Sequence, residues 1–289
     1  MRAEGIIIKG IGGFYYVKAS HNVYECKARG VFRKEKITPM IGDRVTIETD
    51  GEKGSITEIM PRSSSLVRPP VANIDTMLIV IAAAEPAPNL TVADKMLVNA
   101  EISGIKPAVC INKTDLMGSD EIKDTYEKAG YEVLMVSAEK NEGIDKLCEF
   151  LRDKNTAFAG LSGVGKSSLL SLITNDDLET GAVSEKIRRG RHTTRHVELF
   201  ELPFGGYVMD TPGFSQLEVE GIRAEDLWRY FPEMTDCEGE CRFRGCAHIN
   251  EPDCAVKDKL SEGKIALSRY ESYRELYEKL KQTKEWLLK

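Results

Sequence analysis

The chain has 289 residues, of which 42% are hydrophobic and 30% charged, and its formal net charge is −6. This composition indicates a globular protein of two or three domains, and the acidic balance excludes a protein that binds nucleic acid through its overall charge. No apolar stretch reaches the roughly 20 residues that a membrane span requires. We therefore predict no membrane association, and the N-terminus lacks the pattern of a signal peptide.

The N-terminal region consists of short β-type runs separated by Gly, Asn, Asp and Lys. These runs are GIIIKG, GFYYVKA, VYECKA, DRVTIET and GSITEIM. Many short strands with turn residues between them favour a small barrel or sandwich. Residues 1–70 hold 12 Lys and Arg against 8 Asp and Glu, which makes this module mildly basic. The Ser- and Pro-rich stretch PRSSSLVRPP that follows is typical of a linker.

From Asn73 onward, apolar runs alternate with helical stretches. The strand candidates are TMLIVIAAA, PAVCINK, EVLMVSA and NTAFAG, and the helix candidates are DKMLVNAEISG, EIKDTYEKAG, GIDKLCEFLRD and KSSLLSLI. This alternation predicts a parallel sheet covered by helices on both faces. The stretch HVELFELPFGGYVMDTPG predicts a hairpin, and KIALSRYESYRELYEKLKQTKEWLL predicts a long amphipathic helix near the C-terminus.

The stretch AFAGLSGVGKSSLL has the spacing of a phosphate loop, G-x-x-x-x-G-K-[ST]. Glycines let backbone N–H groups turn toward an anion, and the helix that follows adds its positive N-terminal end. Lys166 would reach the β- and γ-phosphates, and Ser167 would ligate Mg²⁺. A bare glycine-rich turn is the alternative, but a strand candidate precedes the loop and a helix candidate follows it. The residues assigned to the loop are Gly160, Leu161, Ser162, Gly163, Val164, Gly165, Lys166, Ser167 and Ser168.

Three further motifs complete a guanine nucleotide site. Asp210 of MDTPGF can hold Mg²⁺ through water, and the N–H of Gly213 can meet the γ-phosphate. Asp115 of NKTD can accept from guanine N1–H and N2–H₂ together, a donor pair that adenine lacks. In MVSAEK, the backbone N–H of the Ser137-Ala138 turn can donate to guanine O6. NKTD alone is more often a polar turn, but with the other motifs it predicts a GTP site. Its residues are Asn112, Lys113, Thr114 and Asp115.

The chain order is guanine reader, Ser-Ala turn, phosphate loop and then D-x-x-G. The set is complete, but it is rotated relative to ordinary GTPases, in which the phosphate loop comes first. Because the termini of compact domains often lie close together, a circular permutation is structurally easy. We therefore predict a GTPase domain whose chain has been permuted.

This motif order resembles the RsgA (YjeQ/YloQ) family of bacterial small-ribosomal-subunit biogenesis GTPases. The resemblance rests on GLSGVGKSSLL, GRHTTRHVELF and DTPGF, with CRFRGCAHINEPDCAV downstream and a β-rich module upstream, and it covers essentially the whole chain. It implies a multi-domain fold: an all-β OB-fold barrel in residues 1–66, an α/β circularly permuted Ras-like P-loop GTPase domain in 67–222, and a mostly helical zinc-binding domain in 223–289. It also implies a cytoplasmic monomer that binds GTP and GDP. Such a protein docks on the 30S subunit and its 16S rRNA late in maturation, and the subunit stimulates hydrolysis.

The hydrolytic residues are expected in SEKIRRGRHTTRH, between the phosphate loop and D-x-x-G. Thr193 and Thr194 could each complete the Mg²⁺ shell, and the family pattern favours Thr194. Phe214 stands where a Ras-type protein has its water-positioning Gln, and Phe cannot orient water. The resemblance instead assigns His192 to catalysis, together with Lys166 and Thr194. A polar loop residue or an RNA contact is the alternative for His192.

Four of the seven cysteines fall within residues 237–254, which indicates a metal site in a reducing cytosol. Three thiolates and one imidazole suit a closed, structural Zn²⁺ site. The candidate ligands, spaced C-x₄-C-x-H-x₅-C, are Cys241, Cys246, His248 and Cys254. Cys237 is a fifth candidate that the family pattern omits, and a disulfide pair is the alternative. We expect one Zn²⁺ per chain, and Mg²⁺ bound with GTP.

Two functions are compatible with these motifs. The first is a GTPase that tests ribosome assembly. The second is an RNA-binding assembly scaffold whose nucleotide site is a conformational lock with little turnover, and Phe214 keeps this alternative open. Asp115 disfavours an ATPase or a small-molecule kinase.

Overall fold

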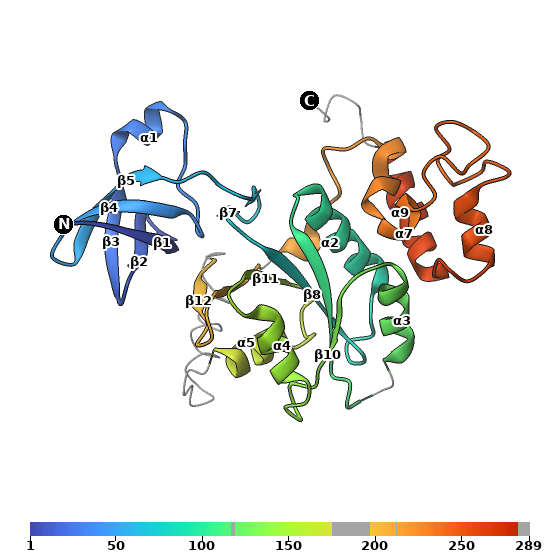
Figure 1. The fold of residues 1–289 in the computed structure, drawn as a ribbon, viewed down its shortest axis with the longest axis horizontal. Coiled ribbons are helices and arrows are strands. Elements are labelled where there is room, and N and C mark those ends of the chain that lie inside the picture. The colour runs from blue at the N-terminus through green and yellow to red at the C-terminus, as the bar shows by residue number, and fades with distance from the viewer. Residues whose placement is uncertain (117–118, 175–196, 212, 283–289) are drawn as a thin grey trace. The chain divides into compact units, whose positions relative to one another are not determined.

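The computed structural model describes residues 1–116, 119–174, 197–211 and 213–282 (Figure 1). Contacts between residues divide the chain into two compact units, which are described separately. The first unit contains Met1–Met77, Cys148–Phe158 and Lys166–Phe214, and the second contains Leu78–Leu147, Ala159–Gly165 and Ser215–Lys289. These units do not correspond to the domains expected from the sequence, so the boundaries at residues 66 and 222 stay predictions.

The N-terminal part of the first unit is a closed barrel with strand order β1-β2-β3-β5-β4. Its neighbouring strands are antiparallel except for β3 and β5, which run parallel. The barrel elements are β1 (Arg2–Ile11), β2 (Phe14–Ala19), β3 (Asn22–Ala28), α1 (Gly30–Lys34), β4 (Arg44–Asp50) and β5 (Lys53–Ile59). Its core includes Ile7, Val17, Cys26, Val45, Ile47 and Ile56, all fully buried. A five-stranded barrel of this kind is OB-like, and the β-rich N-terminal module predicted from the sequence is confirmed.

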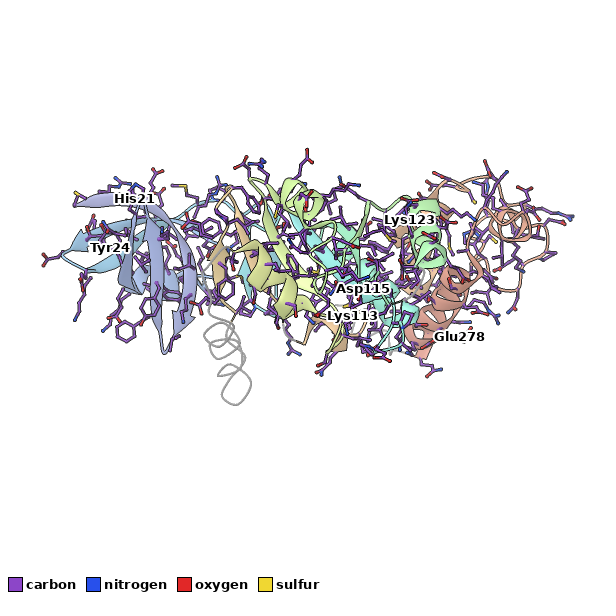
Figure 2. The ribbon with its side chains drawn as sticks, turned by 90° about the horizontal axis from the view of Figure 1, so that it is seen from below. His21, Tyr24, Lys113, Asp115, Lys123 and Glu278 are labelled. Atoms are coloured by element: carbon purple, nitrogen blue, oxygen red, sulfur yellow. The ribbon has the colours of Figure 1, made fainter. Side chains whose placement is uncertain are left out.

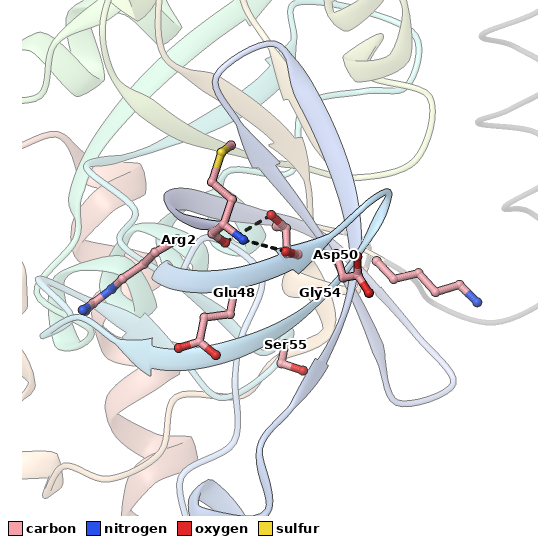
Figure 3. A pocket seen from close by; sticks show the side chains of 8 residues that line it. Arg2, Glu48, Asp50, Gly54 and Ser55 are labelled. Carbon is pink, nitrogen blue, oxygen red and sulfur yellow. Dashed lines mark hydrogen bonds between the residues drawn. The ribbon is translucent and has the colours of Figure 1, made fainter.

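The first residue extends the ladder between β1 and β4. The amino group of Met1 donates to the carbonyl oxygen of Thr49 at 2.7 Å (Figure 3). The N–H of Thr49 donates to the carbonyl oxygen of Met1 at 2.8 Å. Arg2, Glu48 and Asp50 line a surface depression beside these bonds. The depression thus belongs to the strand ladder of the barrel, and none of the predicted site residues lines it.

The predicted linker PRSSSLVRPP is partly regular. Strand β6 (Ser65–Leu66) pairs with β7 (Val71–Ala72) in a two-stranded antiparallel sheet. The side chain of Asn73 fixes this turn, because its Oδ1 accepts from the N–H of Ser63 at 2.9 Å and its Nδ2 donates to the carbonyl oxygen of Gly42 at 2.9 Å. The Ser and Pro content of this stretch does not predict the pairing of β6 with β7, because the pairing is supported by the carbonyl oxygen of Gly42, which is distant in the sequence.

The central sheet has six strands in the order β10-β9-β8-β11-β13-β12. The strands are β8 (Thr76–Ala82), β9 (Lys106–Asn112), β10 (Val133–Met135), β11 (Asn155–Ala159), β12 (Leu199–Glu201) and β13 (Tyr207–Asp210). Strands β9 and β10 pair in parallel, as do β11 and β13, whereas β12 and β13 form an antiparallel hairpin. Strands β8 and β11 are buried over their whole length, which explains their continuous apolar sequences. The mostly parallel sheet and its terminal hairpin are therefore confirmed.

Helices complete both units. They are α2 (Leu90–Ile102), α3 (Asp120–Lys128), α4 (Ile144–Leu151), α5 (Lys166–Ile173), η1 (Phe214–Gln216), η2 (Ala224–Tyr230), α7 (Pro232–Thr235), α8 (Ala255–Ser261) and α9 (Leu267–Gln282). The C-terminal helices of the second unit share one apolar core, which includes Leu227, Phe231, Met234, Tyr273 and Leu276. This mostly helical C-terminal region confirms the expected fold class. Among the described helices, none has the length and apolar character needed to cross a membrane.

Candidate nucleotide site and metal centre

In the second unit, Asn112 joins three of the predicted nucleotide motifs. It is the last residue of β9 and is buried. Its Nδ2 donates to the carbonyl oxygen of Val164 in the glycine-rich loop at 3.0 Å, and its Oδ1 accepts from the backbone N–H of Ala138 at 3.1 Å. One amide therefore holds together segments that lie 52 and 26 residues away in the sequence.

Gly165 leaves the space that this amide needs. A Cβ atom at position 165 would lie 2.2 Å from Nδ2 of Asn112, and the backbone φ of Gly165 is +95°. Both the close approach and the positive φ favour glycine. The glycine that precedes Lys166 in the phosphate loop is thus explained by its packing against the guanine-reading motif.

Asp115 is held in place by the Ser137 hydroxyl. Lys113 and Asp115 lie just beyond the end of β9 (Figure 2). Ser137 Oγ donates to Asp115 Oδ1 at 2.6 Å and accepts from the N–H of Lys140 at 3.1 Å. The hydroxyl bond is the main cause that lowers the pKa of Asp115. The carboxylate is therefore ionised at neutral pH, when it can only accept hydrogen bonds.

Two neighbours of Asp115 have partners of their own. The Nζ of Lys113 donates to the carbonyl oxygen of Glu85, in the loop that precedes α2. The Oγ1 of Thr114 donates to the carbonyl oxygen of Val136 at 3.1 Å. A backbone N–H of the Ser137-Ala138 turn is expected to donate to guanine O6, and of these two groups the N–H of Ala138 already donates to Asn112 Oδ1. If the N–H of Ala138 also donated to guanine O6, its hydrogen would be shared between O6 and Asn112 Oδ1.

In the first unit, Lys166 and Asp210 act on each other electrostatically. Burial lowers the pKa of Lys166, and Asp210 opposes this effect. Burial raises the pKa of Asp210, and Lys166 opposes that. Asp210 Oδ1 is buried and has no hydrogen-bond partner within the described parts of the chain. Because an unpaired buried carboxylate oxygen is unfavourable, this atom fits a cation or a cation-bound water.

The other phosphate-side residues are placed as follows. Ser167 and Ser168 are exposed in the first turn of α5, directly after Lys166. Gly213 is exposed with a φ of +84°, and Phe214 beside it is 1% exposed. His192, Thr193 and Thr194 lie outside the described residues. The buried Phe214 ring thus follows D-x-x-G, where a polar side chain would be needed to orient water.

A cluster of three cysteines and one histidine lies in the C-terminal region. One ligand atom from each residue falls within 4.8 Å of the others in the set Cys241, Cys246, His248 and Cys254. His248 Nδ1 lies 3.3 Å from Cys254 Sγ and 3.6 Å from Cys241 Sγ, and the two sulfurs lie 4.0 Å apart. Zn–S bonds of 2.3 Å in a tetrahedron give sulfur separations of roughly 3.8 Å. The donor set and its spacing therefore fit a tetrahedral metal ion.

The electrostatics of the cluster also favour a metal. Burial raises the pKa of Cys246 to about 12, so a thiolate there needs a compensating cation. Burial lowers the pKa of His248, which favours the neutral imidazole that binds metals. Cys237 is buried but is not part of the cluster.

Hydrogen bonds outside the cluster shape the ligand loop. The Glu251 carboxylate accepts from the N–H groups of Ala247 and Ile249, each at 3.0 Å. Tyr270 and Tyr273 of α9 donate to the carbonyl oxygens of His248 and Ala247 at 2.7 and 2.6 Å. Such outer partners orient metal ligands, and α9 therefore supports the metal centre directly.

The fold and these motifs define a circularly permuted P-loop GTPase with an N-terminal barrel and a C-terminal Cys₃His centre. Residues 59–220 match the family model described as RsgA GTPase, and residues 4–56 match the RsgA N-terminal domain. The chain belongs to the RsgA GTPase family.

Relatives along the full chain support this assignment. A protein of Agathobacter rectalis named small ribosomal subunit biogenesis GTPase RsgA is 47% identical, over 96% of this chain and 98% of the relative. One of the same name from Caldanaerobacter subterraneus is 49% identical, over 97% of each chain. Among solved structures, YjeQ from Thermotoga maritima is 35% identical, with a TM-score of 0.82 over 98% of this chain and all of the other. YloQ, described as a circularly permuted GTPase, is 37% identical, with a TM-score of 0.81 over 98% of this chain and 96% of the other.

Sequence reasoning missed several supporting residues. Glu85 and Glu251 belong to no motif, and only the fold brings them to Lys113 and to the metal loop. The hydroxyl of Ser137 was assigned no role in the Ser-Ala turn. The sequence gives little indication that Ser137 contacts Asp115, because the two residues meet only when β9 and β10 pair in parallel.

Proposed function

We propose that this protein hydrolyses GTP to GDP and phosphate and acts in the late maturation of the small ribosomal subunit, which stimulates the hydrolysis. The observation that carries the proposal is the double hydrogen bond of Asn112, because it ties the guanine reader to the glycine-rich loop and the Ser-Ala turn. Motifs that were permuted in the sequence thereby serve one ligand. The names of the curated relatives support the ribosomal partner.

On the base side, Asp115 selects guanine. Its carboxylate would accept from guanine N1–H and N2–H₂, and Ser137 fixes the orientation of that carboxylate. An adenine base lacks this pair of donors and would leave the carboxylate acceptors unpaired, so the site would discriminate against adenine. Lys113 and Thr114 would border the base, and Ala138 would donate to its O6.

On the phosphate side, the backbone N–H groups of Gly160–Gly165 would cradle the phosphates. Lys166 would neutralise the charge that develops on the β- and γ-phosphates during transfer. Mg²⁺, when bound, would screen the same charge. Ser167 and Asp210 are its proposed protein contacts, with Thr194 as the third, and the unpaired Asp210 Oδ1 supports this assignment.

His192 is our proposed catalytic residue for orienting the attacking water. Phe214 is buried and apolar at the position that follows D-x-x-G, so a different side chain must orient the water. The proposed metal in the C-terminal cluster is one structural Zn²⁺. It would fold the ligand loop and take no part in hydrolysis, because four protein ligands leave no open position.

The proposed setting is a cytoplasmic monomer that binds 16S rRNA within the 30S subunit, with no membrane association. The test is GTP turnover by wild-type protein and by the His192→Ala variant, each with and without purified 30S subunits. We expect 30S to raise the wild-type rate and His192→Ala to lose most of that increase. A wild-type rate that stays negligible with 30S, while GTP still binds, would favour the assembly scaffold instead.

A further inference from the structure

Helix α2 carries two neighbouring charged residues that are both buried. Asp94 is fully buried and Lys95 is 8% exposed. Buried Asp and Lys side chains are rare unless they are paired. Because successive helical residues point about 100° apart, the two residues face different partners. Both partners lie in the C-terminal part of the second unit.

Asp94 faces an ion cluster centred on Arg269 of α9. Arg269 Nη1 donates to Asp94 Oδ1 at 2.7 Å, and Nε and Nη2 donate to the two carboxylate oxygens of Glu233 at 2.7 and 3.1 Å. The guanidinium carbon lies 4.5 Å from the Phe231 ring centre and 5.3 Å from that of Tyr131. A bidentate, ring-packed guanidinium fixes geometry more strictly than an ammonium group would. This cluster therefore holds α2, α7 and α9 in one arrangement.

Lys95 faces the segment that leaves D-x-x-G. Its Nζ donates to Glu218 Oε1 at 3.0 Å, and Glu218 comes five residues after Gly213 in the sequence. The next residue, Val219, packs in the same apolar cluster as Val98 of α2. The Glu218 side chain is 59% exposed, so this ion pair is held less tightly than the Arg269 cluster.

The first turns of α2 border the glycine-rich loop. The helix is capped by Asn89, whose Oδ1 accepts from the N–H of Val92 at 3.0 Å. Ala93 and Met96 of α2 line a narrow crevice together with Leu161 and Val164 of the loop. Glu85, just upstream, accepts from the guanine-side lysine, Lys113. One helix about 20 Å long, from its 13 residues, thus contacts both the nucleotide motifs and the C-terminal region.

We propose that α2 transmits the nucleotide state to the C-terminal domain. In this relay, the Arg269 cluster stays formed in both nucleotide states, whereas the Lys95–Glu218 ion pair changes when the γ-phosphate is bound or lost. A turn that tightens on the γ-phosphate and relaxes after hydrolysis is a general GTPase switch. Here the chain runs from that turn to Glu218 within five residues, so movement of the turn strains or relieves the ion pair. This inference rests on the proposed binding of GTP and GDP.

Trp228 offers a local reporter for the test. The chain has two tryptophans, Trp228 and Trp286. The Trp228 ring packs edge-on against the ring of the metal-ligand candidate His248, with centroids 5.8 Å apart. In a Trp286→Phe background, emission therefore reports on the C-terminal core alone. The experiment compares emission with GDP and with a non-hydrolysable GTP analogue, and a separate titration measures the binding of each nucleotide.

Two variants remove the ion pair from either side, and one variant is the matched control. Lys95→Gln and Glu218→Gln each abolish the pair, whereas Lys123→Gln removes an exposed ion pair within α3. We expect the two nucleotides to give different emission in the parent and in Lys123→Gln. We expect that difference to be lost in Lys95→Gln and Glu218→Gln, with nucleotide affinity retained.

The outcomes separate this proposal from the proposed function. If neither nucleotide binds, the proposed function fails and the relay fails with it. If both bind but the parent shows no difference in emission, or if Glu218→Gln keeps the difference, the relay alone is overturned. Because Glu218 is largely exposed, its variant decides the matter even if Lys95→Gln does not fold.

Discussion

Replacement of Arg269 with Met should strongly destabilise the C-terminal part of the protein. The Arg269 side chain is 1% exposed and donates to both Asp94 and Glu233. Met has a similar length but no charge, so the substitution leaves two buried carboxylates without their cation. Removing one partner of a buried ion pair costs about 3–5 kcal/mol. Since proteins are stable by only about 5–15 kcal/mol, this loss is a large fraction of the total.

Companion variants separate charge from packing. Asp94→Asn leaves the bidentate bond between Arg269 and Glu233 intact, so it should cost less than Arg269→Met. The triple variant Arg269→Met, Asp94→Leu, Glu233→Met should recover much of the loss, because well-packed apolar groups can replace a buried ion cluster. Arg269→Met alone should therefore be less stable than the triple variant.

The dependence of stability on pH gives an independent check. Burial raises the pKa of Asp94 above its ordinary 3.8, although Arg269 opposes this. A raised folded-state pKa means that the carboxyl contributes most to stability below pH 3.8 and that this contribution is lost as pH rises through the folded-state pKa. The stability of Asp94→Asn relative to wild type should therefore improve as pH rises above about 4.

Urea denaturation followed by Trp228 emission in the Trp286→Phe background measures these free energies, because Trp228 packs against the same C-terminal core. Metal content should be measured in parallel, so that a lost metal is not mistaken for a lost ion pair. If Arg269→Met lowers the free energy of unfolding by less than about 1 kcal/mol, the Arg269 cluster does not behave as a buried ion pair, and the reasoning is refuted.

Three further changes test the proposed sites. Asp115→Asn should shift preference from guanosine to xanthosine nucleotides, because the amide now donates to the C2 oxygen of xanthine; unchanged GDP affinity would contradict the assignment of Asp115. Ser167→Ala should lose most of the 30S-stimulated turnover through its Mg²⁺ contact, at a cost of several kcal/mol in the transition state; a near-normal stimulated rate would argue against that contact. The purified protein should contain about one Zn²⁺ per chain, which Cys246→Ser should lose together with local folding. Cys237→Ser, the matched control, should keep its metal, and the reverse result would mean that the ligands are misassigned.

The local motifs were predictable because their chemistry depends on spacing. Gly165 and Lys166 are neighbours in any fold, and the metal-ligand candidates fall within 14 residues of one another. The strands were predictable for a similar reason: β8 and β11 are buried over their full length, so their apolar runs are continuous. The sequence pattern predicts that this helix begins at Asp94, whereas α2 begins four residues earlier at Leu90, because the Asn89 side chain caps it there.

Contacts between distant segments could not be predicted in this way. Arg269 is separated from Asp94 by 175 residues, and no local pattern pairs them. A weak signal existed, because Arg269 stands three and four residues before the buried Ser272 and Tyr273 of α9. A cation at core spacing in an amphipathic helix indicates a buried partner, but the helix alone does not say which acid it is.

The permutation explains why α2 lies at the junction with the C-terminal region. In this chain order, α2 is the first helix after the barrel and linker, and the segment around Glu218 is where the GTPase motifs end. Permutation is structurally easy where the two ends of a domain are neighbours. The Lys95–Glu218 ion pair, and the shared apolar cluster that contains Val98 and Val219, are consistent with that adjacency. The C-terminal region therefore begins beside α2, and Arg269 then pairs with Asp94, the residue next to Lys95. A change in the turn after Asp210 has a short covalent path to this junction, whereas in an unpermuted chain the rest of the GTPase fold would come between them.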